Sequence, residues 1–145
     1  MRQIIYVFIA ILLTACGGTK SVDVKQRGDN VKEVYLLVGE GGGFTGAYNE
    51  YILYPDARVE VWDEMEQESI YKGSVTKKEA ADIFEKWGEI GQIEVPNSRP
   101  GNMNYRIGYY ENGVVKTLRW SDSQAVDEAI LDFFNSTYQL LRNAK

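Results

Sequence analysis

The chain has 145 residues, a net charge of −5, one cysteine and no histidine. Without histidine, Ser-His-Asp catalysis and metal or haem centres held by histidine are excluded, and we expect no cofactor and no metal centre. The acidic balance lacks the basic footprint that nucleic-acid binding requires, so nucleic acid is not an expected partner.

The first 15 residues have the parts of an export signal. Arg2 supplies positive charge, and residues 4–13 form an unbroken apolar run. A membrane-spanning helix needs about 20 residues, so this shorter run suits the hydrophobic region of a cleavable signal. The next segment, Leu13-Thr14-Ala15-Cys16, resembles the lipobox of bacterial lipoproteins.

This resemblance implies that Cys16 becomes the mature N-terminus and carries diacylglycerol and an amide-linked acyl chain. Stable anchoring takes two or more chains, so the lipid bilayer is an expected partner. In such lipoproteins an Asp after the cysteine tends to retain the protein in the inner membrane. Gly17 stands there instead, which favours the outer membrane. The alternative is an ordinary signal peptide with a chance cysteine.

Residues 16–30 are small, polar and charged, and they predict a tether that follows the lipidated cysteine. Residues 31–145 are enough for one compact domain and too few for two of ordinary size. Because Cys16 is consumed by lipid, the domain can form no disulfide and must depend on its own core. Removal of residues 1–15 leaves a net charge of −6.

The first half of the domain predicts strands. Residues 39–46, GEGGGFTG, predict a flexible loop, and Pro55-Asp56-Ala57 predicts a tight turn between two alternating segments. The expected strands cover residues 31–38, 48–54, 58–62 and 68–73.

The second half predicts two helices and a hairpin. Thr76 and Glu79 form a capping-box pattern ahead of apolar residues at helical spacing, which predicts a helix over 77–90. Asn112-Gly113 predicts a tight hairpin turn between strands over 105–111 and 114–120. Ser121 and Gln124 suggest a second capping box, before an amphipathic helix that ends near residue 142.

The resulting order, β-β-β-β-α-β-β-α, predicts an α+β fold. Adjacent strands without βαβ alternation indicate an antiparallel sheet of about five to six strands, with both helices packed on one face. The two-residue turn fixes the register of the second hairpin. On its mostly apolar face, which we expect under the helices, the pairs are Tyr105 with Trp120, Ile107 with Leu118, and Tyr109 with Lys116.

The opposite face of this hairpin carries three candidate binding residues, Arg106, Tyr110 and Arg119, which suit a carboxylate or a sugar. Arg106 and Arg119 are directly cross-strand, where like charges repel unless an anion lies between them. Neighbouring acidic side chains could supply that anion without any ligand, and we favour this explanation.

Two other motifs have a structural and a functional interpretation. Residues 41–46 match G-x-G-x-x-G, but a strand follows where dinucleotide binding requires a helix. A loop is the expected role, with Phe44 as a candidate contact for a protein partner. An acidic cluster does not match EF-hand spacing, so a solvated turn is expected rather than a metal site. Its members are Asp63, Glu64, Glu66 and Glu68.

The stretch from residue 39 to 141 resembles a loose group of small α+β domains, many of them exported lipoproteins of unknown function. The likeness is carried by the Gly42-Gly43-Phe44-Thr45-Gly46 loop and the Pro-Asp turn, in which Ala57 replaces the usual glycine. Emfourin, a proteinaceous inhibitor of thermolysin-like metalloproteases, is similar in outline. The resemblance implies the fold, and no inhibitory residue is carried over.

We therefore expect a non-enzymatic, lipid-anchored domain that binds a protein or another component of the cell envelope. The alternative is a carboxylate-based hydrolase that acts on envelope glycans or peptides. That alternative predicts a concave pocket holding two acidic residues.

Overall fold

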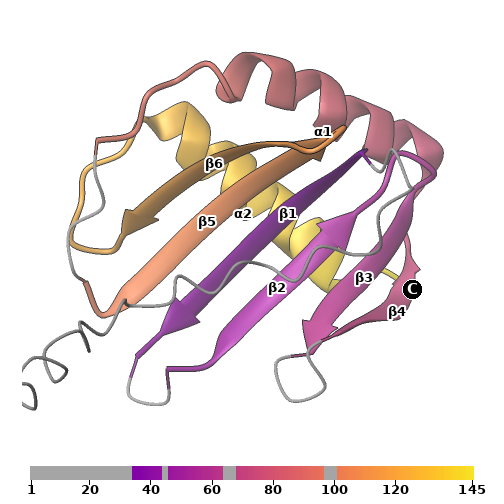
Figure 1. The fold of residues 1–145 in the computed structure, drawn as a ribbon, viewed down its shortest axis with the longest axis horizontal. Helices are drawn as coiled ribbons and strands as arrows, with labels where there is room; N and C mark the ends of the chain where they lie inside the picture. Colours follow the sequence, from indigo (N-terminus) through magenta and orange to yellow (C-terminus); the bar gives the residue numbers. More distant parts are fainter. Residues whose placement is uncertain (1–33, 44–45, 64–67, 97–100) are drawn as a thin grey trace, which may run out of the picture. The chain divides into compact units, whose positions relative to one another are not determined.

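The computed structural model of the protein describes residues 34–43, 46–63, 68–96 and 101–145. These residues form one sheet of six strands and two helices (Figure 1). The strands are β1 (Val34–Gly42), β2 (Tyr48–Leu53), β3 (Arg58–Asp63), β4 (Glu68–Ser74), β5 (Met103–Glu111) and β6 (Val114–Ser121). The helices are α1 (Lys77–Ile90) and α2 (Glu128–Arg142). The predicted α+β class and element order are confirmed.

The strand order across the sheet is β4-β3-β2-β1-β5-β6, and all neighbours are antiparallel. The first four strands form a meander, and the last two add to the other side of β1. Strands β4 and β5 consequently run in the same direction with three strands between them. A connection between such strands must cross the sheet, and α1 supplies the crossover.

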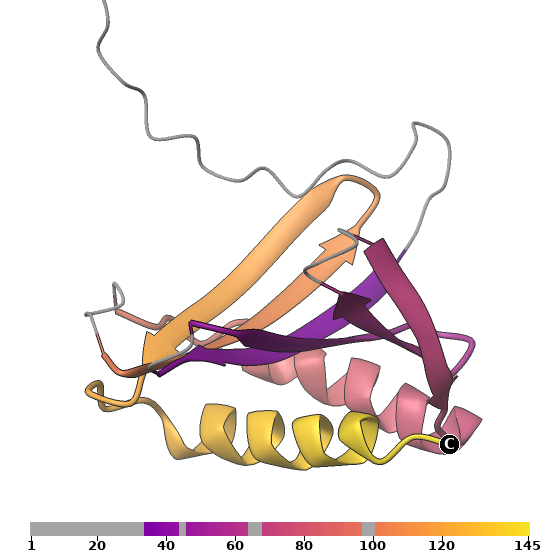
Figure 2. The same cartoon turned by 90° about the horizontal axis from the view of Figure 1, so that it is seen from below.

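Both helices lie on the same face of the sheet, as predicted (Figure 2). Their buried side chains repeat at helical spacing, for example Ile83, Trp87 and Ile90 on α1. Aromatic rings join the helices to the second hairpin: Trp87 stacks on Tyr109 at 5.8 Å, and Phe134 meets Tyr105 edge-on at 5.5 Å. The apolar face of that hairpin is therefore part of the main core.

The start of α1 is as predicted. The Thr76 hydroxyl accepts a hydrogen bond from the Glu79 amide, and the Glu79 carboxylate accepts one from the Thr76 amide at 2.8 Å. Hydrogen bonds from the Thr76 hydroxyl and amide hold the pKa of Glu79 below its ordinary value. A capping box satisfies amide groups that the first helical turn leaves without partners.

The predicted start of α2 was wrong. The N-cap is Asp127, whose carboxylate accepts a hydrogen bond from the Ala129 amide at 2.8 Å. Ser121 is instead the buried last residue of β6, and the Gln124 side chain donates to the carbonyl of Pro96. Residues 122–127 carry the chain from the end of β6 to the helix layer. Ser121 therefore cannot cap α2.

The predicted limits of the glycine-rich loop were also wrong. Gly39 to Gly42 belong to β1, where each pairs with β5 in an extended ladder. The turn proper is shorter and uses left-handed backbone at Gly43 and Gly46, each with φ of 66°. A central strand has hydrogen-bonding partners on both sides, and these partners outweigh the weak strand propensity of glycine.

The predicted signal over residues 1–15, the tether over 16–30 and Phe44 lie outside the described residues. Within the part of the chain that the structure describes, no helix is long and apolar enough to cross a membrane.

Candidate binding surface

The register of the β5–β6 hairpin is as predicted from its turn. Asn112 and Gly113 form the turn with φ of 50° and 81°, the left-handed backbone that a tight hairpin of this type requires. Arg106 pairs with Arg119, and Tyr110 pairs with Val115. The three predicted hairpin residues therefore share the face of the sheet that the helices do not cover.

Arg106 has an internal partner on this face. Its guanidinium donates to the carboxylate of Glu50, which lies on β2, on the far side of β1. Between them β1 contributes Gly39, which is in register with both residues. A Cβ on Gly39 would lie 2.7 Å from Cγ of Glu50 and 3.1 Å from the carbonyl oxygen of Asn49. Glycine thus leaves the space in which the ion pair crosses the central strand.

The Arg106–Glu50 pair lies to one side of the cross-strand arginines rather than between them. The carboxylate of Glu50 contacts Arg106 across β1, on the side away from Arg119 on β6, so it is not the anion that was expected between the two arginines. The pair is well shielded from water, because the side chains of Arg106 and Glu50 are 22% and 9% exposed. Within the described residues, Nε of Arg106 is buried and has no hydrogen-bond partner.

A second carboxylate on the same face, that of Glu60 on β3, is held in a similar way. Arg58 and the Ser69 hydroxyl both donate to it, and the Tyr54 hydroxyl donates at 3.0 Å. The Arg58 guanidinium also lies over the Tyr54 ring, 3.7 Å from its centroid. Both buried glutamates of this face are therefore paired with arginine.

Tyr110 packs internally rather than projecting as an open contact. Its ring stacks on Tyr35 with centroids 4.3 Å apart, and Tyr35 meets Tyr54 at 5.9 Å. Tyr35 and Tyr110 pack against a small apolar cluster of Leu37, Ile52 and Tyr54. The face opposite the helices is thus a second, smaller core with charged groups at its margin.

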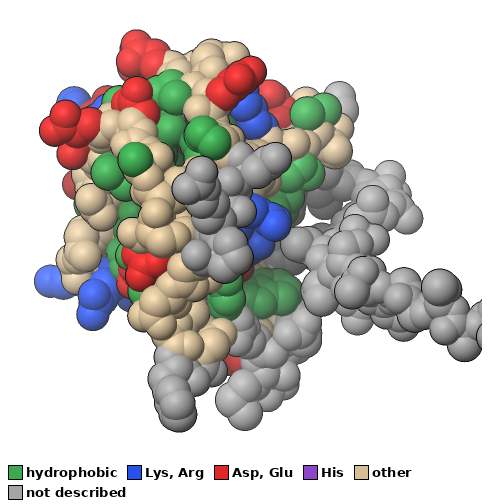
Figure 3. Space-filling view, turned by 90° about the vertical axis from the view of Figure 1, so that its left-hand side faces the viewer, with side chains coloured by type: hydrophobic (Ala, Val, Ile, Leu, Met, Phe, Trp, Pro, Cys, Tyr) green, Lys and Arg blue, Asp and Glu red, His purple; other side chains and the backbone are tan. Residues whose placement is uncertain are grey.

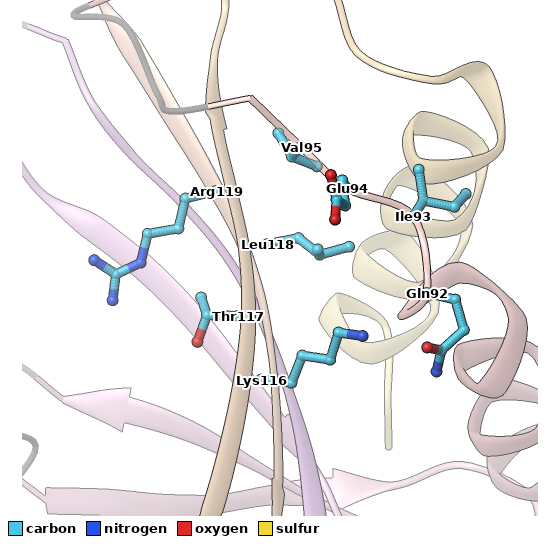
Figure 4. A pocket seen from close by; sticks show the side chains of 8 residues that line it. All are labelled: Gln92, Ile93, Glu94, Val95, Lys116, Thr117, Leu118 and Arg119. Atoms are coloured by element: carbon cyan, nitrogen blue, oxygen red, sulfur yellow. The ribbon is translucent and has the colours of Figure 1, made fainter.

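Arg119 differs from the other predicted residues, because it is exposed on the last strand of the sheet. Among the described residues neither it nor Lys116 forms an ion pair. A hollow of about 470 Å³ lies beside this strand, between β6 and residues 92–95 (Figure 4). The side chains of Lys116 and Leu118 point to the hollow, whereas Arg119 and Thr117 project to the other side of β6.

The hollow is mixed in chemistry. Its lining residues are Gln92, Ile93, Glu94, Val95, Lys116, Thr117, Leu118 and Arg119. The sequence offered no signal for it, because residues 92–96 form no regular element and the sheet edge beside them is set by the strand order. Figure 3 views the domain from the side where β6 ends, and acidic, basic and apolar side chains are intermixed there. Recognition on this side must depend on local arrangement.

Three tyrosines between the helices and the sheet have raised pKa values: Tyr105 and Tyr109 on β5, and Tyr138 on α2. Burial first, and a hydrogen bond to Glu40 second, raise the pKa of Tyr138. Burial also raises the pKa of Tyr105 and of Tyr109. All three pack in or against the main core, so these shifts reflect packing and do not mark a reactive site.

The acidic cluster around the β3–β4 turn is described only in part. Asp63 and Glu68 end and begin the two strands and face each other in register, while Glu64 and Glu66 lie outside the described residues. Within the ranges that are described, no group of three or more histidine, cysteine, aspartate or glutamate side chains could hold a metal ion.

No protein-family model matches this chain, and no curated protein matches it either.

Proposed function

We propose that the chain is an envelope lipoprotein, held in the outer membrane by acyl chains on Cys16, whose domain binds a protein partner without catalysis. The lipobox resemblance and Gly17 support the anchor and its membrane. One observation carries the binding role: the β5–β6 hairpin presents Lys116 and Arg119 at a sheet edge beside a hollow of about 470 Å³.

The state of the buried carboxylates favours binding over the hydrolase alternative. Glu50 and Glu60 both contact arginine. Each of these carboxylates accepts hydrogen bonds from internal donors, so its contacts are made within the sheet. The hollow at β6 has one carboxylate, Glu94, among its lining residues. Among the described residues, neither location is a concave pocket lined by two carboxylates, which the hydrolase alternative predicts.

The anchor is tested by expression of the full chain in a bacterium with two membranes, in medium containing radioactive palmitate. We expect label in the wild-type protein and none in Cys16→Ala, with the labelled protein in the outer-membrane fraction. An unlabelled wild type would overturn the anchor, and label confined to the inner membrane would overturn the location.

The binding role is tested by crosslinking and recovery of the lipidated protein from its own envelope. We expect one or more proteins to be recovered with the wild type and lost with the double variant Lys116→Glu, Arg119→Glu. Lys72→Glu on β4 is the matched control, because it reverses one charge at the opposite edge. Equal recovery with the wild type and the double variant would remove the hairpin edge from the contact.

The inhibitor version of this proposal follows from the outline similarity to emfourin. It predicts that purified residues 21–145 inhibit a thermolysin-like metalloprotease at micromolar concentration or below. Absence of inhibition across several such proteases would retire this version and leave the anchor and the hairpin contact to their own tests.

A further inference from the structure

The two edges of the sheet differ in how open they are. At the β4 edge, a register shift interrupts the ladder between β3 and β4, and the Ser74 amide donates to the carbonyl of Lys145 at 3.0 Å. The chain end therefore caps part of that edge. Bulges and covering segments are the usual protection of an edge strand.

The β6 edge has less protection. Strand β6 pairs with β5 alone, and half of the backbone groups of an antiparallel edge strand point away from its partner. Among the described residues, no backbone hydrogen bond joins β6 to residues 92–96. Residues 92–95 and β6 line the hollow from opposite sides. The Gln124 side chain donates a hydrogen bond to the Pro96 carbonyl at 2.9 Å.

The charges of β6 select the partner. Lys116 lies on the side of the strand that faces the hollow, and Arg119 lies on the other side. A second copy of β6 would bring like charges together, which opposes pairing. An acidic strand would place a carboxylate beside each cation, and complementary charge also speeds and orients association.

We propose that β6 accepts an extended acidic segment of a partner protein as a seventh strand of the sheet. Main-chain hydrogen bonds to the outward groups of β6 would supply affinity, and side chains would supply specificity. The segment carries two carboxylates three residues apart, one opposite Lys116 and one opposite Arg119. The residue opposite Leu118 is apolar, because Leu118 faces the hollow beside Ile93 and Val95. This proposal rests on the proposed function and names how the hairpin edge binds.

The probe for this proposal is the synthetic hexapeptide Val-Glu-Val-Thr-Glu-Val, which has the required spacing. Its matched control is Val-Lys-Val-Thr-Lys-Val, with the same length and the opposite charge. Titrated against the full, lipidated chain in detergent micelles, the acidic peptide is expected to bind about tenfold more tightly than the basic one. Tenfold corresponds to about 1.4 kcal/mol, which two exposed charge pairs can supply.

Variants of Lys116 and Arg119 test whether the peptide binds at β6. The double variant Lys116→Glu, Arg119→Glu is expected to reverse the preference between the two peptides, while Lys72→Glu leaves it unchanged. The milder pair Lys116→Gln, Arg119→Gln abolishes the preference without reversal, and serves where the stronger variant fails to fold. Thermal unfolding of each variant identifies any that lose the fold.

Two results would overturn strand addition. If the charges of β6 serve only to keep the edge from pairing, neither peptide binds. If both peptides bind equally, or if the β6 variants leave the preference intact, the site is elsewhere or does not select charge. The palmitate and recovery experiments use no peptide. If the peptides do not bind but a partner is recovered from the envelope, only the strand-addition proposal is overturned. If the acidic peptide binds but no partner is recovered, the proposed function is overturned.

Discussion

The two faces of the sheet are both buried at their centres, but they are held by different chemistry. Under the helices, the side chains of Leu36, Val38 and Ile107 are fully buried among other apolar groups. On the opposite face, apolar side chains share the space with Glu50 and Glu60, and both carboxylates need arginine. Burial of a charge is costly unless it is paired. The stability of the helix-covered face thus depends on how well its apolar side chains fill space, and that of the opposite face on particular ion-pair partners.

The largest predicted effect lies on the helix-covered face. Phe133 is 1% exposed and packs against Trp87 at 6.3 Å. Phe133→Ala should lower the free energy of unfolding by about 3–5 kcal/mol, because it removes apolar contact and leaves a cavity. Urea unfolding measures the change. Phe133→Leu, which keeps most of the volume, should cost clearly less, and equal losses would contradict dependence on volume.

The ion pair of the opposite face gives the next effect. Glu50→Gln should lower the free energy of unfolding by about 2–3 kcal/mol. This is at or below the lower end of the range for breaking a buried ion pair, because Arg106 keeps some contact with water. Replacement of both Glu50 and Arg106 by Met should lower the free energy of unfolding by less than the sum of Glu50→Met alone and Arg106→Met alone. A double-mutant cycle with no coupling energy would show that the contact across β1 does not stabilise the fold.

The next prediction compares Gly39, where a side chain would clash with its neighbours, with Gly88, where there is space for one. Gly39→Ala should destabilise by about 1–3 kcal/mol, because its Cβ needs space that Glu50 and the Asn49 carbonyl occupy. Gly88→Ala is the matched control, since it lies within α1 with open space around it and should stabilise by about 0.5–1 kcal/mol. Chemical denaturation of both variants gives the two signs, and a stabilising Gly39→Ala would remove the argument for a crossing space.

The last predicted effect, which is the smallest at neutral pH, concerns Tyr138, whose side chain α2 buries against the sheet. Because burial raises the pKa of Tyr138, its contribution to stability is complete below the unfolded value of about 10 and is lost as the pH rises above it. The unfolding free energy should therefore fall above about pH 10. Tyr138→Phe should flatten this decline, as followed by circular dichroism. An unchanged slope in the variant would assign the alkaline loss to other groups.

The elements that local sequence could predict are those whose determinants are close together in the chain. The limits of α1 follow from Thr76 and Glu79 with the apolar spacing behind them. The register of the second hairpin follows from Asn112-Gly113. These signals act over a few residues, so tertiary contacts had little to change.

The parts that sequence could not predict depend on residues far apart. Arg106 and Glu50 are 56 residues apart, and only the strand order brings them to either side of Gly39. The extension of β1 through glycine has the same origin, because Glu50 and Tyr48 on β2 lie over Gly39 and Gly41. The sequence favoured an acidic side chain between Arg106 and Arg119, but the carboxylate that contacts Arg106 comes from across β1, on the side away from Arg119, and only the strand order shows it.

The most direct test of the account is a map of amide hydrogen exchange in the full chain, with and without the acidic hexapeptide. We predict that added protection appears at alternate residues of β6, where new main-chain hydrogen bonds form, and that amides around Gly39 do not change. Added protection around Gly39, with none on β6, would contradict the proposal that β6 binds the partner and that the Arg106–Glu50 face only stabilises the fold.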